Sequence, residues 1–133
     1  MTPLEILNAL GAIASLVSSA NVVLKSVSRD EILLDRAEAN GERLADNAIL
    51  RDVVATAVAD PVVEAIAERI VDRKNRAAHK IRSGGSVSDE TGEMIADICD
   101  FLTAIKAQRG GVLGAEEFDK MWADYGCENK IGV

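Results

Sequence analysis

The feature that most constrains the fold of this chain is a long stretch near its start without any charged side chain. The stretch runs from Ile6 to Leu24 and is about as long as the shortest membrane span. Its small residues recur at every fourth position, which lets a second helix approach closely: Gly11, Ser15 and Ser19. Asparagines and serines interrupt the apolar run, and no basic residue precedes it. We therefore expect a buried central helix, with a membrane-active helix as the alternative.

The rest of the chain carries helix signals and no convincing strand pattern. Aromatic residues make up only 3% of the sequence, and Ala, Ile, Leu and Val supply most of the apolar side chains. Ser28 to Glu31 has the pattern of a capping box, Asn40-Gly41 is typical of a helix end, and Asp60-Pro61 is typical of a helix start. These signals predict an all-α, single-domain bundle of five to six helices. The expected helices cover residues 3–27, 29–40, 42–59, 61–82, 89–109 and 115–125.

Size and charge fit one soluble domain. The chain has 133 residues and a formal net charge of −7, which argues against a surface that is basic throughout. Two cysteines, Cys99 and Cys127, are too few for a disulfide scaffold, and Cys99 falls on an apolar stripe. We therefore expect reduced cysteines, with Cys127 as a free thiol, and a cytoplasmic protein. His79 is the single histidine, so we expect no metal site and no cofactor.

One basic cluster stands out against the acidic background. Six basic residues and a single acid, Asp72, lie between residues 69 and 82. Such a local excess of positive charge is typical of an anion-binding surface, although a solvated helix face gives the same pattern. The basic residues are Arg69, Arg73, Lys74, Arg76, Lys80 and Arg82.

Helical geometry places the histidine of this cluster away from the core. His79 lies nine residues, about half a turn, from the apolar Ile70, so we expect an exposed imidazole. Asn75, Arg76 and Arg82 share its face. A histidine can act as acid or base near neutral pH, and arginines can grip a phosphate. Together these groups could cleave RNA without a metal, using the 2′-hydroxyl as the nucleophile.

The segment from Lys74 to His79 resembles the R-N-x-x-x-H signature of HEPN domains, which are all-helical bundles that include ribonuclease toxins and defence nucleases. Asn75 and His79 match the asparagine and the catalytic histidine of that signature. Lys74 stands at the arginine position and lacks the bidentate fork, so Arg73 could serve instead. The resemblance implies a site assembled across a homodimer, RNA as substrate and an antitoxin or defence partner. His79 would be the general acid/base and Arg73 or Lys74 would contact the scissile phosphate.

In this interpretation the remaining cations bind the RNA phosphates: Arg69, Arg76, Lys80 and Arg82.

Two alternatives stay open. The segment from Ala78 to Arg82 also resembles the phospho-accepting helix of histidine phosphotransfer domains, with His79 as acceptor, although Ser83 to Ser86 breaks the helix at once. The second alternative is a non-catalytic module that binds a protein or associates with a membrane.

Overall fold

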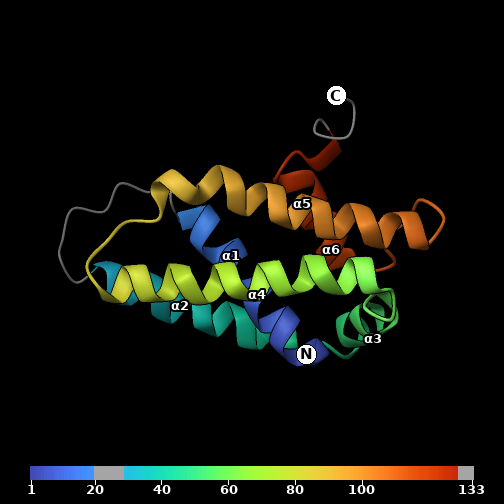
Figure 1. The fold of residues 1–133 in the computed structure, drawn as a ribbon, viewed down its shortest axis with the longest axis horizontal. Coiled ribbons are helices and arrows are strands. Elements are labelled where there is room, and N and C mark those ends of the chain that lie inside the picture. The colour runs from blue at the N-terminus through green and yellow to red at the C-terminus, as the bar shows by residue number, and fades with distance from the viewer. Residues whose placement is uncertain (20–28, 129–133) are drawn as a thin grey trace.

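Helices form all the regular secondary structure in residues 1–19 and 29–128, the part of the chain that the computed structural model describes (Figure 1). Six α-helices and one short 3-10 helix form a single body, so the prediction of an all-α bundle is confirmed. The helices are α1 (Pro3–Ser19), α2 (Arg29–Ala45), α3 (Ala48–Ala57), α4 (Pro61–Arg82), η1 (Ser88–Glu90), α5 (Thr91–Gln108) and α6 (Glu116–Asp124).

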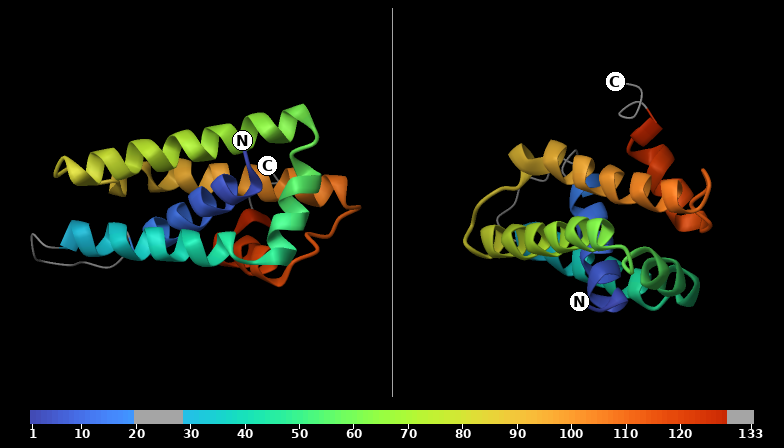
Figure 2. Two further views of the ribbon diagram at one scale, coloured as in Figure 1. Left: turned by 90° about the horizontal axis from the view of Figure 1, so that it is seen from below. Right: turned by 45° about the vertical axis from the view of Figure 1, so that its right-hand side comes forward.

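The central element is α1, which contacts α2, α3, α4 and α5 (Figure 1; Figure 2, left). Its apolar side chains are buried on nearly every side because neighbours surround it. The fully buried ones are Ile6, Leu7, Leu10 and Ile13. The prediction of a central buried helix is therefore confirmed for the described part of α1, and residues 20–27 of that predicted helix lie outside the described residues.

Two glycines let α1 and α2 pack with their backbones in contact. A Cβ atom on Gly11 would lie 2.8 Å from the backbone oxygen of Asn40, and one on Gly41 would lie 2.3 Å from the backbone oxygen of Asn8. The Asn40 side chain also donates a 2.7 Å hydrogen bond to the Gly11 carbonyl oxygen. The prediction that Asn40-Gly41 ends a helix is wrong, because these residues form the contact between α1 and α2 within a continuous α2.

The break between α2 and α3 lies at Asn47 instead. The Asn47 side chain accepts hydrogen bonds from the backbone nitrogens of Ile49 (3.0 Å) and Leu50 (3.1 Å), which is N-cap geometry. The helix predicted for residues 42–59 is therefore divided between the end of α2 and the whole of α3. The other N-cap prediction is confirmed, since the Asp60 carboxylate accepts from the Val62 nitrogen and α4 begins at Pro61.

Helices α4 and α5 run antiparallel along one side of the bundle (Figure 1). After α5 the chain reverses, and α6 lies next to α5 (Figure 2, right). Three buried side chains attach α6 to the core, namely Phe118, Met121 and Trp122. Tyr125, which follows α6, donates a 2.9 Å hydrogen bond to the carbonyl oxygen of Ala14 on α1. Burial raises the pKa of the Tyr125 hydroxyl, so this group keeps its proton at neutral pH.

The two cysteines form a disulfide between the middle of α5 and the residue after Gly126. Cys99 and Cys127 are joined and both are buried. The prediction of reduced cysteines with Cys127 as a free thiol is wrong. Spacing along the chain gave no sign of the bond, which depends on α6 returning to α5. The cysteines therefore give no support to a reducing compartment.

Two further sequence expectations concern the capping box at Ser28 and a membrane-active first helix. Ser28, the first residue of the expected capping box, lies outside the described residues. None of the helices described in residues 1–19 and 29–128 combines the length and apolarity that a membrane crossing needs.

Candidate functional site

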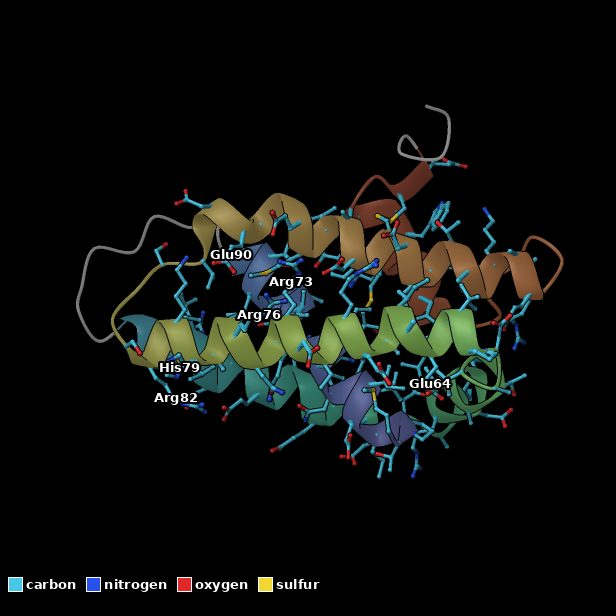
Figure 3. All side chains as sticks on the ribbon, in the orientation of Figure 1. Glu64, Arg73, Arg76, His79, Arg82 and Glu90 are labelled. Atoms are coloured by element: carbon cyan, nitrogen blue, oxygen red, sulfur yellow. A yellow bond between two sulfur atoms is a disulfide. The ribbon has the colours of Figure 1, made fainter. Side chains whose placement is uncertain are left out.

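The basic cluster of α4 is divided among several sides of the helix. Figure 3 shows Arg73 and Arg76 on the side of α4 that faces α5, and His79 and Arg82 on the side toward α2. Arg73 and His79 are six residues apart, which places them about 120° apart around a helix. Within one chain, the structure does not bring the expected arginine and the expected histidine together.

Arg69 and Arg73 form ion pairs with α5. Nε of Arg69 donates to the Asp97 carboxylate (2.9 Å) and its terminal nitrogen to Asp100 (2.8 Å). Nε of Arg73 donates to Asp97, and its terminal nitrogen contacts Glu93 at 2.8 Å. Asp97 is almost fully buried, and it holds both guanidinium groups. These arginines therefore join α4 to α5.

The charge state of Arg73 follows from this arrangement. Burial alone lowers the pKa of Arg73, but hydrogen bonds and charges from Asp97 and Glu93 outweigh that effect and raise it. The side chain is only 15% exposed. Arg73 is thus a permanently charged residue that two carboxylates already hold within the bundle, and a phosphate would have to compete with both of them.

Two other cations of the cluster are also paired. Lys80 contacts Glu90 of η1 at 2.6 Å, and Arg82 contacts Glu38 of α2 at 3.0 Å. The hydrogen bond to Glu90 raises the pKa of Lys80. Both pairs are partly exposed, so they would exchange with a competing anion more easily than the pair of Arg73 with Asp97.

The expected residues without an ion pair among the described residues are Lys74, Arg76 and His79. His79 and Arg76 are exposed, which confirms the prediction of an exposed imidazole. Asn75 lies one turn before His79 and is exposed as well. These groups form an accessible polar surface on α4. The cation on the same side of α4 as the imidazole is Arg82, which the Glu38 carboxylate holds.

Lys74 and Asn75 also line a groove that the sequence did not predict. The groove has a volume of about 620 Å³ and lies where α1, α2 and α4 meet. Its apolar lining consists of Leu4, Ala9, Ala45 and Val71. Its polar lining consists of Glu5, Asn8, Glu42, Asp46, Lys74 and Asn75.

Negative charge dominates this groove. Three carboxylates face one ammonium group, and none of the three forms an ion pair with any described side chain. Leu4 is 47% exposed although it lies on the first turn of a helix that is otherwise mostly buried. An apolar surface rimmed with unpaired acids can accept an apolar side chain flanked by cations.

Sequence reasoning missed the groove because its walls come from three separate helices. The ion pairs of α4 with α5 did leave a signal. Arg69 and Arg73 are four residues apart, and Glu93, Asp97 and Asp100 repeat at spacings of four and three, so each set lies on one helix face. Antiparallel packing of those faces accounts for Arg69 and Arg73 without any external ligand.

Comparisons with protein-family models, with curated proteins and with solved structures gave no match.

Proposed function

We propose that this chain is a protein-binding helical domain, and that the groove between α1, α2 and α4 takes a cationic amphipathic helix of a partner protein. The observation that carries the proposal is the pairing of the exposed Leu4, within an apolar lining, with three unpaired carboxylates in one groove. The net charge of −7 would favour the approach of a basic partner.

A helix fits this groove better than an extended segment. An extended peptide usually binds by adding a strand to the edge of a sheet, and the described residues contain no strand. The groove walls are helices, whose backbone groups are already hydrogen-bonded internally. A partner helix satisfies its own backbone and needs only side-chain contacts. Its apolar residues, spaced three and four apart, would lie along Leu4, Ala45 and Val71.

The carboxylates would set the choice of partner. Glu5, Glu42 and Asp46 can pair with lysines or arginines that flank the apolar stripe of the bound helix. Each partly exposed pair contributes on the order of 0.5 kcal/mol. Three such pairs contribute roughly 1.5 kcal/mol, which corresponds to about tenfold in affinity.

The first test is the fluorescence anisotropy of a labelled helical peptide built from leucine and lysine. We expect saturable binding to the wild type, and roughly tenfold weaker binding to the triple variant Glu5→Gln, Glu42→Gln, Asp46→Asn. A charge-matched control replaces three exposed acids of α4 that do not line the groove: Glu64→Gln, Glu68→Gln, Asp72→Asn. Equal weakening by the two triple variants would mean that only net charge attracts the peptide, and would contradict the proposal.

The apolar part of the groove has its own matched pair of variants. Leu4→Asp places a charge on the apolar lining at a residue exposed enough to tolerate it, and we expect it to abolish specific binding. Val62→Asp makes the same change at a residue that is 69% exposed and lies outside the groove. Binding should survive in Val62→Asp, and a scrambled peptide of the same composition should bind neither protein tightly.

A second candidate function is RNA cleavage by the outer surface of α4, as the HEPN resemblance implies. The observation that favours it is the exposed His79 with Asn75 one turn before it. Arg73 is held by Asp97, so the cation on the same side of α4 as His79 is Arg82, which would have to leave Glu38 to contact RNA. Lys74 and Arg76 form no ion pair with a described side chain, and a homodimer would have to supply further cations. Cleavage of RNA in EDTA, lost in His79→Ala and kept in Arg51→Ala, would support this candidate over the binding domain.

A further inference from the structure

Residues 109–127, near the end of the described part of the chain, form a flap that is tied to the bundle at both ends. Its loop contains three glycines with positive φ, namely Gly110, Gly111 and Gly114. Residues other than glycine rarely adopt a positive φ, so the three glycines allow the chain to reverse sharply after α5. Helix α6 then lies on the bundle, and Cys127 returns to α5.

The noncovalent attachments of the flap are its buried apolar side chains and the hydrogen bond of the Tyr125 hydroxyl to Ala14. The buried side chains are Leu113, Ala115, Phe118, Met121 and Trp122. Helix α6 has nine residues, which is too short to be stable without packing. Phe118, Met121 and Trp122 supply that packing, and the Lys106 ammonium lies 4.4 Å from the centre of the Trp122 ring. The ion pair of Glu117 with Arg43 is largely exposed and contributes little.

The covalent attachment is the disulfide between Cys99 and Cys127. Cys99 lies buried in the middle of α5, and the two cysteines are 28 residues apart in the sequence. Without the bond, only the loop, the packing of the apolar side chains and the noncovalent contacts of α6 and Tyr125 would hold the flap to the bundle. With it, the flap is a closed loop whose opening is limited by the entropy of ring closure.

Helices α1 to α5 contact one another without the flap. The contacts of α1 with α2, α3, α4 and α5 and the ion pairs of α4 with α5 form without any residue of the flap. We propose that the Cys99–Cys127 disulfide is a redox latch, and that its reduction releases the flap while α1 to α5 stay folded.

The chemistry of release needs a dithiol reductant. One thiolate of the reductant attacks a sulfur of the disulfide, and its second thiol resolves the mixed disulfide. The reductant loses two electrons and two protons and becomes a cyclic disulfide, and Cys99 and Cys127 become two thiols. Both sulfurs belong to buried residues, at 3% and 0% exposure, so attack requires the flap to open transiently.

Trp122 is the single tryptophan of the chain and lies in the flap, so its fluorescence reports release directly. We expect a dithiol to produce two titratable thiols, a red shift of the Trp122 emission and stronger quenching by acrylamide. Far-UV circular dichroism should lose no more signal than α6 contributes. The variant Cys99→Ser, Cys127→Ser should show the same spectra without reductant.

A second variant tests the opening step. Tyr125→Phe removes the hydrogen bond to the Ala14 carbonyl, so we expect dithiols to reduce the Cys99–Cys127 disulfide faster in this variant. An unchanged rate of reduction would contradict flap opening as the step that limits reduction. An unchanged Trp122 spectrum after two thiols appear would overturn the proposal. So would loss of the whole helical signal on reduction, or two free thiols in the protein under oxidising conditions.

Discussion

At the scale of single residues, one glycine and one carboxylate determine how neighbouring helices pack. Gly41 contacts the backbone of α1, and Asp97 holds two arginines of α4. Neither role follows from the residue type alone. Each depends on an element that is distant in the sequence, which is why the sequence predicted a helix end at Gly41 and a phosphate contact at Arg73.

Substitution of Gly41 tests the close approach of α1 and α2. In Gly41→Ala the new Cβ would lie 2.3 Å from the Asn8 backbone oxygen, so the helices must move apart. Overpacking of this kind costs about 3 kcal/mol, at the upper end of the usual range. Urea denaturation measures the loss.

The matched control for this substitution is Gly92→Ala on α5, where a Cβ would meet nothing within 4 Å. Removing a glycine from a helix without strain stabilises by about 0.5 kcal/mol. If Gly41→Ala behaved like Gly92→Ala, the contact between the two backbones would be wrong.

Substitution of Asp97 tests whether the basic cluster serves the fold. Asp97→Ala leaves the poorly exposed Arg73 without its main partner, and we expect a loss of about 3 kcal/mol in the free energy of unfolding. Asp100→Ala removes an acid that is 58% exposed and should cost less than about 1 kcal/mol. Equal losses in denaturation experiments would show that burial of the Asp97 pair has no energetic weight.

At the scale of elements, the sequence predicted the type of secondary structure better than the residues at which each helix begins and ends. The bounds of α4 follow from Asp60-Pro61 and from the glycines after Arg82, and the structure agrees with both. The boundary between α2 and α3 was misplaced, because an Asn-Gly pair is a common helix end and here the glycine serves packing instead.

Asn47 is the residue that sets this boundary, and its substitution should destabilise the start of α3. Asn47→Ala deletes the acceptor for the Ile49 and Leu50 nitrogens, so we expect a loss of about 1 kcal/mol in the free energy of unfolding. Asn47→Asp keeps an acceptor at the same position and should stay near the wild type. Thermal denaturation of the two variants separates the cap from other effects of the substitution.

At the scale of the whole molecule, the fold class could be predicted from the sequence and the candidate site could not. Helix periodicity and composition are local properties, so an all-α bundle follows from them. The groove requires Leu4, Glu42 and Val71 to meet from three helices, and the disulfide requires α6 to return to α5. His79 was correctly expected at the surface, but four of the six cations in its cluster, Arg69, Arg73, Lys80 and Arg82, proved to be partners of acids on α2, η1 and α5.

The measurement that tests the central claim most directly is a map of backbone amide chemical shifts during titration with the cationic amphipathic peptide. Binding in the groove predicts saturable changes centred on Leu4, Ala9, Ala45 and Lys74, with little change elsewhere. Changes centred on His79 and Arg82, changes confined to α6, or scattered changes that never saturate would contradict the proposal that this groove is the binding site.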